Sequence, residues 1–526
     1  MAGSDTPSVT VRSSRHMVAS ADQLATQAGL EVLARGGSAA DAAIATNAAI
    51  AVTAPHLCGM GGDLFALVHD GHGVHALNGA GRAGSGAEAE ALRREGHTTM
   101  PFRHDIRTVT VPGCVDGWVT LHERFGRLPL ADILEPAVHL AKDGFPASPL
   151  LVGSVGNLDE RGRESLAELV GQARRPGDRV RRPGAARALR AIAEGGRDGF
   201  YRGEFGDGLL ALGAGWYTAD DLATPGSDWV EPLSWPAFGR VLHTIPPCSQ
   251  GYLLLGAAGL ADALPLPADP DDERWAHLLI EAAKAAGRDR PAVLCDGTEG
   301  MALLEAIDAR GGEIDPERAA RPPHPQAAGD TTYLCTVDEH RMGVSLIQSN
   351  ASGFGSWIAE PGTGINLHNR GLGFSLEPGH PAELAPGRRP PHTLSPALAT
   401  HEDGRLAAVF GTMGGDAQPQ ILLQVAARLF LHGQSPAAAI RAARWVLHGP
   451  VTGFDTWTAP GGPHVLVEGH APETWRDRLA SRGHDVRVVP PWDSSFGHSH
   501  AIVVQDDGFL AGAADPRAWI GSVAGS

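Results

Sequence analysis

A threonine at the start of an apolar segment could supply a nucleophile and its base together. Thr331 follows the proline-rich run ARPPHPQAAGD, and two apolar segments, 331–337 (TTYLCTV) and 342–348 (MGVSLIQ), flank the polar residues DEHR. This pattern predicts a β-hairpin that is entered from a loose linker. Cutting the Asp330–Thr331 peptide bond would leave a hydroxyl and a free α-amine on one residue. Because an α-amine has a reference pKa near ~7.7–8, it could accept the hydroxyl proton without a histidine.

A pair of glycines could stabilise the charge that such a nucleophile creates. Gly414 and Gly415 lie between the strand-like segment LAAVFGTM and the helical pattern AQPQILLQVAARLF. Two successive amides without side chains, at the positive end of a helix, could hold an oxyanion. A plain strand-to-helix turn would also favour glycine, so this pair gains its meaning only together with Thr331.

Composition excludes several other chemistries. The 526-residue chain has a formal net charge of −17, which argues against nucleic-acid or anionic-membrane partners. Only two lysines occur, which leaves little room for Schiff-base or pyridoxal chemistry, and no phosphate-binding GxxxxGK[ST] motif is present. His498 and His500 in GHSH share a strand face, but no third ligand is near them in the sequence. We therefore expect no metal and no cofactor.

The N-terminal part predicts helices packed under a sheet. Ser20 and Gln23 form a capping-box pattern for a first helix, and Ser38 and Asp41 repeat it for a second one at 39–52. The second segment is almost entirely Ala, Ile and Val, which predicts a helix buried on every side. The N-terminus shows no charged and apolar leader pattern, and no apolar run of about 18 residues occurs, so we expect a cytoplasmic protein.

Several blocks of the chain resemble the γ-glutamyltranspeptidase family. They are ADQLATQAGLEVLARGGSAADAAIATNAAIAVTAPHLCGMGGDLFAL, VTVPGCVDGWVTLHERFGRLPLADILEPAVHLAKDGFPAS, the TTY opening at Thr331, the glycine pair and the terminal ADPR. The resemblance implies an α+β fold, the four-layer αββα sandwich of N-terminal nucleophile hydrolases. It also implies self-cleavage into a large subunit, 1–330, and a small subunit, 331–526, which together form one unit. The two fragments would stay together as a heterodimer, which could pair with a second copy.

The same resemblance assigns roles to individual residues. Thr331 would be the nucleophile, Ser349 would orient its α-amine, and the amides of Gly414 and Gly415 would form the oxyanion hole. Arg82 lies close to where the family places an arginine that clamps a substrate carboxylate, about two positions out of register. An ordinary surface-loop arginine is the equal alternative for Arg82.

This chain departs from the family pattern at the groups that bind the head of a glutamyl substrate. Gly373 replaces the acidic residue that grips the α-ammonium, and Ala351, beside Asn350, replaces an asparagine. His392 and Thr393 replace a Ser-Ser pair. Losing a buried carboxylate that pairs with an ammonium weakens binding by several kcal/mol. The sequence therefore predicts a retained acyl-transfer chemistry on a changed small-molecule substrate.

Four functions fit this pattern to different degrees. The first is an amidohydrolase or acyltransferase of the acylase or oxamate amidohydrolase type. A natural-product homologue that cleaves an amide or C–C bond through an acyl- or oxalyl-enzyme is the second. A genuine γ-glutamyl hydrolase or transpeptidase and an uncut, non-catalytic binding protein are the others. A preference for acyl groups that carry a carboxylate but no ammonium would distinguish the first two functions from a genuine γ-glutamyl enzyme.

Overall fold

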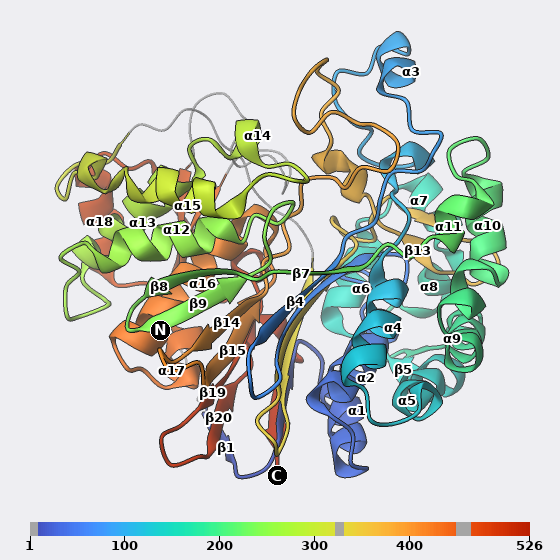
Figure 1. Ribbon diagram of the computed structural model, residues 1–526, viewed down its shortest axis with the longest axis horizontal. Helices are drawn as coiled ribbons and strands as arrows, with labels where there is room; N and C mark the ends of the chain where they lie inside the picture. The colour runs from blue at the N-terminus through green and yellow to red at the C-terminus, as the bar shows by residue number, and fades with distance from the viewer. Residues whose placement is uncertain (1–8, 321–330, 449–463) are drawn as a thin grey trace.

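Two seven-stranded antiparallel sheets lie face to face, and helices cover their outer faces (Figure 1). The computed structural model describes residues 9–320, 331–448 and 464–526. Apolar side chains of both sheets, among them Phe65, Tyr333, Ile347 and Val409, form the core between them. The four layers are the α+β sandwich that the family resemblance implies.

The first sheet has the order β21-β2-β10-β11-β3-β4-β7. The predicted hairpin lies at its centre as β10 (Thr332–Val337) and β11 (Gly343–Ser349), and every residue of both strands is buried. The flanking strands are β2 (Met17–Ser20), β3 (Asp63–His69), β4 (Val74–Gly79), β7 (Asp228–Val230) and β21 (Ser522–Gly525). Because this hairpin is buried on both faces and paired on both edges, the residues at its open end have fixed positions.

The second sheet has the order β1-β20-β19-β15-β14-β9-β8. Its strands are β1 (Val11–Ser13), β8 (Leu233–Ala237), β9 (Arg240–Thr244), β14 (Ala397–Thr400), β15 (Leu406–Thr412), β19 (Ser499–Val504) and β20 (Leu510–Ala513). Both sheets thus draw strands from either side of Thr331. Residues before and after the predicted cut build one interleaved unit, whereas the cut itself stays a prediction because Asp330 lies outside the described residues.

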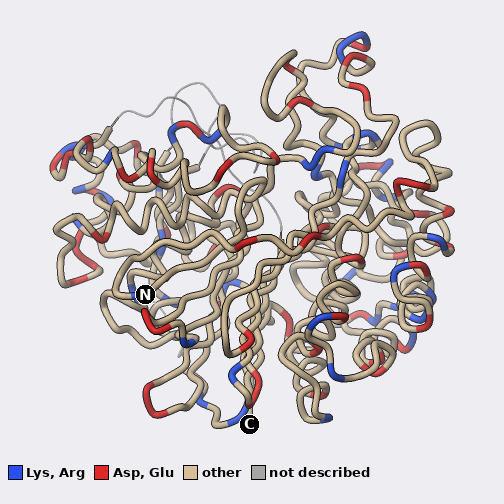
Figure 2. Tube along the Cα trace, in the orientation of Figure 1, with Lys and Arg blue, Asp and Glu red and all other residues tan. Residues whose placement is uncertain are grey.

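The helical layers pack on the outer faces of the sheets. One layer contains α1 (Gln23–Ala34), α2 (Ala39–Thr53), α4 (Cys114–Phe125), α5 (Leu130–Asp143) and α9 (Pro183–Tyr201). The other contains α12 (Tyr252–Asp262), α13 (Glu273–Gly287), α15 (Gly300–Asp308), α16 (Gln418–Ala426) and α18 (Glu473–Ser481). Figure 2 shows acidic and basic residues intermixed over these outer layers.

The two predicted helix starts fare differently. Ser38 and Asp41 form the predicted capping box of α2, and all residues of that helix are buried. The prediction for Ser20 is wrong: Ser20 ends β2, and the Asp22 side chain caps α1 by accepting a hydrogen bond from the Leu24 amide at 2.8 Å. Pairing of β2 with β10 and β21 fixes Ser20 in extended backbone, so the cap moves two residues on. Within the described residues, no helix has the length and apolar character needed to span a bilayer.

Candidate active site

The nucleophile candidate lies at the open end of the central hairpin. Thr332 pairs with Gln348, so Thr331 and Ser349 come together where the two strands separate. The Thr331 hydroxyl donates a hydrogen bond to Ser349 Oγ at 3.0 Å, and both side chains are buried. The strand register alone therefore produces the contact between these two hydroxyls that the family resemblance implies.

Ser349 also connects the hairpin to a buried arginine. Its Oγ accepts hydrogen bonds from the Ala351 amide at 2.8 Å and from Arg370 Nη2 at 3.3 Å. Arg370 begins the short helix η3 (Arg370–Gly373), and its Nη1 donates to Thr393 Oγ1 at 3.0 Å. The guanidinium, only 2% exposed, therefore lies one side chain away from the hydroxyl of Thr331.

A buried carboxylate balances the charge of Arg370. Asp63 accepts a hydrogen bond from His392 Nε2 at 3.1 Å, and His368 Nδ1 lies 3.7 Å from the same oxygen. Burial alone would raise the pKa of Asp63, but His368, His392 and Arg370 together lower it to about 2. Burial lowers the pKa of Arg370 to about 10, with Asp63 opposing that change. At neutral pH both groups are ionised, so the site contains a fixed buried cation.

The glycine pair lies where the sequence predicts, between β15 and α16. Gly414 has φ +135° and Gly415 has φ +55°, and both are buried. Across the described ranges, neither amide donates a hydrogen bond to a protein group. Buried amides without acceptors are rare in folded proteins, and such donors could serve a developing oxyanion. Gln250 Nε2 links this turn to the arginine side of the site by donating to the Gly415 carbonyl at 2.9 Å and the Thr393 carbonyl at 3.1 Å.

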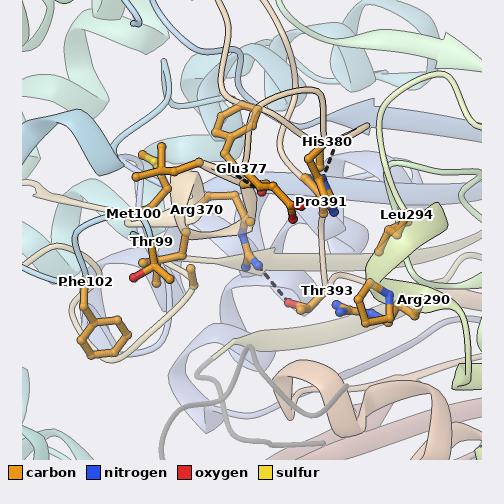
Figure 3. A pocket seen from close by; sticks show the side chains of 18 of the residues that line it. Thr99, Met100, Phe102, Arg290, Leu294, Arg370, Glu377, His380, Pro391 and Thr393 are labelled. Atoms are coloured by element: carbon orange, nitrogen blue, oxygen red, sulfur yellow. Dashed lines mark hydrogen bonds between the residues drawn. The ribbon is translucent and has the colours of Figure 1, made fainter. Parts of the chain in front are cut away.

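A cavity of about 560 Å³ opens beside this network (Figure 3). Arg370, Thr393, Ala351 and Arg290 line it, together with the predicted position Gly373. A Cβ atom built on Gly373 would collide with the carbonyl oxygen of Pro391. The backbone itself therefore leaves no space for the acidic side chain that the family carries at this position.

The other predicted binding residues are not gathered in this cavity. Arg82 lines a separate, smaller cavity, and it donates to Asp228 at 3.1 Å and to the Gly387 carbonyl at 3.2 Å. His392 is fully buried against Asp63 and Phe65, and burial lowers its pKa to about 3. The Asn350 side chain donates to the Pro55 carbonyl at 3.0 Å. The His392 ring thus contacts the floor of the site and is not among the residues that line the cavity, so its predicted role in substrate binding stays a prediction.

Arg370 is the residue that sequence reasoning missed. It lies in NRGLGF, the segment that was read only for the acidic residue missing at Gly373. An arginine three residues before that glycine was the available signal, because one helical turn brings such residues to the same face.

The paired histidines of GHSH do not form a metal site in the described part of the chain. His498 bonds Ser494 Oγ at 2.8 Å, and the Asp515 amide donates to His500 Nδ1 at 3.3 Å. The cluster of three possible ligands that the described residues do contain is elsewhere, at His277, Glu281 and His484. There the ammonium of Lys284 lies 2.8 Å from Glu281, so a cation already occupies that network.

Comparison with known proteins identifies the family. The family model for gamma-glutamyltranspeptidase matches residues 25–524. The chain belongs to the γ-glutamyltranspeptidase family. Its relatives in that family include the oxamate amidohydrolase proenzyme of Klebsiella pneumoniae, 36% identical over 96% of this chain and 97% of the relative. The acylase ACY 1 proenzyme of a Pseudomonas species is 30% identical over 96% and 92%.

Solved structures of the same family agree with the fold. Cephalosporin acylase from Bacillus halodurans superimposes with a TM-score of 0.90 at 35% identity, covering 100% of this chain and 99% of the other. The chain is thus an enzyme of the N-terminal nucleophile hydrolase type, as its resemblance implies. The four-layer sandwich of this chain is the fold that the acylase shares.

Proposed function

We propose that this family member is an autoprocessing amidohydrolase that acts on acyl groups bearing a carboxylate and no ammonium. The observation that carries the proposal is the buried guanidinium of Arg370, which lines the cavity next to Ser349. A planar guanidinium suits two-pronged binding of a carboxylate, whereas an ammonium would meet a like charge there. The names of the relatives, an oxamate amidohydrolase and acylases, support the same substrate class.

The proposed reaction begins with self-cleavage between Asp330 and Thr331, which would yield the two fragments of a heterodimer. The Thr331 hydroxyl then attacks the substrate carbonyl, and its own α-amine takes the proton. The amides of Gly414 and Gly415 hold the oxyanion. The C–N bond breaks, the leaving amine takes that proton, and an ester to Thr331 remains. Water attacks the ester, the α-amine serves again as base, and the free acid leaves.

In this proposal Arg370 takes the role that the sequence had suggested for Arg82. Arg82 is 38% exposed at its side chain and paired with Asp228, whereas Arg370 is buried next to the nucleophile. Arg82 therefore serves as the matched control for Arg370.

The test compares Arg370→Met and Arg82→Met on three substrates: oxamate, a glutaryl amide and a γ-glutamyl anilide. Removing one partner of a buried charge pair typically costs 2–5 kcal/mol, so Arg370→Met should lower kcat/KM for the two carboxylate substrates by roughly 10²–10³-fold. Arg82→Met should change it by less than about threefold. Rates are normalised to the cleaved fraction on a denaturing gel, because Arg370 also contacts Ser349. Efficient turnover of the γ-glutamyl anilide by the wild type, or a greater loss with Arg82→Met, would contradict the proposal.

A further inference from the structure

The cavity is much larger than the acyl group that Arg370 would hold. One water molecule takes about 30 Å³ of liquid, so an oxalyl group of five heavy atoms fills on the order of 100 Å³. The cavity measures about 560 Å³. Most of it must therefore face the other half of the substrate, the amine that leaves.

Several apolar side chains contribute to the surface of this remaining space, beside polar groups such as Thr99, Ser375 and His380. Met100 and Phe102 approach from the segment before η1 (Ile106–Thr108), and Leu294 follows α14 (Arg290–Val293). Leu372, Phe374 and Leu376 contribute from η3 and the residues after it. Figure 3 shows Met100 and Phe102 on one side of Arg370 and Leu294 on the other. Sites for compact organic ligands combine such apolar side chains with polar groups that fix the orientation of the ligand.

One acidic group lies at the rim of the same cavity. Glu377 is exposed, and its side chain projects toward the cavity above Arg370 in Figure 3. No basic side chain of the described residues forms an ion pair with Glu377. The cavity therefore has the guanidinium groups of Arg370 and Arg290 at its floor, the second bound to Asp416, and the Glu377 carboxylate at its rim.

We propose that these walls form a subsite for the leaving amine, and that the enzyme releases an amine with an aromatic-sized apolar substituent and no carboxylate. This inference rests on the proposed function, since Arg370 must first fix the acyl half. Ammonia, the amine released from oxamate, would leave the walls unused. An amine with its own carboxylate would bring that group toward Glu377, where like charges repel.

The reaction on such a substrate is balanced by water. N-benzyl oxamate and water yield oxalate and protonated benzylamine, through the same oxalyl ester on Thr331 that oxamate would form. Because this ester and its hydrolysis are common to all N-substituted oxamates, differences in kcat/KM report binding and acylation with the different amines.

The experiment compares N-benzyl oxamate, N-methyl oxamate and N-oxalyl phenylalanine on the cleaved wild-type enzyme. Burial of a phenyl group at about 25 cal/mol per Å² predicts a kcat/KM roughly 100-fold higher for the benzyl than for the methyl compound. The phenylalanine compound should be at least about 10-fold poorer than the benzyl compound, and Glu377→Gln should narrow that gap. Equal rates for the benzyl and methyl compounds would overturn the subsite.

Phe102→Ala tests the wall directly. The Phe102 carbonyl accepts a hydrogen bond from Asn369 at 2.8 Å, and this main-chain contact survives the substitution. The kcat/KM of this variant should fall about 10-fold for N-benzyl oxamate and little for N-methyl oxamate. Phe509 is 43% exposed and lies on the β19–β20 turn. Phe509→Ala should leave kcat/KM unchanged for both compounds. A loss on both compounds with Phe102→Ala would indicate a structural role and contradict the subsite.

Failure of the proposed function gives a different result. In that case no oxalyl compound would acylate the enzyme, and a γ-glutamyl benzylamide would. A preference for the γ-glutamyl benzylamide over the methylamide would then still support the amine subsite, and its absence would refute it.

Discussion

The two halves of the active site are built in different ways. At the proposed nucleophile half, strand register brings Thr331 to Ser349, and Gly414 and Gly415 turn the backbone between β15 and α16. At the proposed acyl-binding half, side chains line the cavity, and Arg370 is the buried charge that would bind the carboxylate. A backbone arrangement can persist when the fold persists, whereas specificity that depends on side chains can change within one fold. Under the proposed function, this contrast would let the reaction stay while the substrate changes.

The largest expected effect tests the nucleophile half. Thr331→Ala removes the proposed nucleophile, so the protein should stay as one band on a denaturing gel and lose all measurable amidase activity. Thr332→Ala is the matched control. The Thr332 hydroxyl belongs to the next residue in the chain, is buried, and has no hydrogen-bond partner among the described residues. That variant should be cut and remain active. Cleavage of Thr331→Ala, or a small fragment that begins elsewhere, would remove Thr331 from the reaction.

The next effect tests whether backbone also limits the acyl half. Gly373→Asp restores the acidic residue of the family, but its Cβ would collide with the Pro391 carbonyl. Overpacking of this kind typically costs 1–3 kcal/mol, so Tm should fall by several degrees without any gain of γ-glutamyl turnover. Gly312→Asp, where nothing lies within 4 Å of the added Cβ, should leave Tm nearly unchanged. A stable Gly373→Asp variant that hydrolyses γ-glutamyl anilide would show that side chains alone set this pocket.

The smallest effect concerns the support beneath Arg370. Burial, with Arg370 nearby, lowers the pKa of His392 to about 3, whereas an unfolded histidine titrates near ~6.5. The unfolded state therefore binds the proton first, so this contribution to stability is complete above pH ~6.5 and declines by up to about 1.4 kcal/mol per pH unit toward pH 3. Thermal unfolding between pH 7 and pH 5 should show a shallower decline for His392→Gln than for the wild type.

Other buried histidines also make the stability fall as the pH is lowered. The slope of stability against pH is therefore compared between variants and is not expected to reach zero in any of them. His340→Gln, at a residue 62% exposed at its side chain, is the control. An unchanged slope in His392→Gln would mean that the ring is accessible to protons in the folded state.

The sequence predicts those features that are local or that depend on backbone. The DEHR turn between two apolar segments predicts the β10–β11 hairpin to within a residue, and the Ser38–Asp41 box predicts the start of α2. Arg82 and Arg370 could not be ranked in this way, since both lie next to a glycine in the sequence and they differ in burial. Burial depends on Asp63 and Thr393, which are distant in sequence from Arg370. The cap at Asp22 was missed for a similar reason, because pairing to β10 and β21 decides where β2 ends.

The pairing of β2 with β21 constrains the order of events during synthesis. Residues 20 and 522 lie opposite one another, and β1 pairs with β20 in the other sheet. Strands near the start of the chain therefore cannot pair fully until strands near its end have been synthesised. While the ribosome is still adding residues before 522, β2 keeps one open edge, and such edges favour aggregation. The finished sandwich, and with it the geometry for self-cleavage, can form only after translation of both parts. The last strand therefore closes the open edge of β2, which has lain near the start of the nascent chain since early in translation.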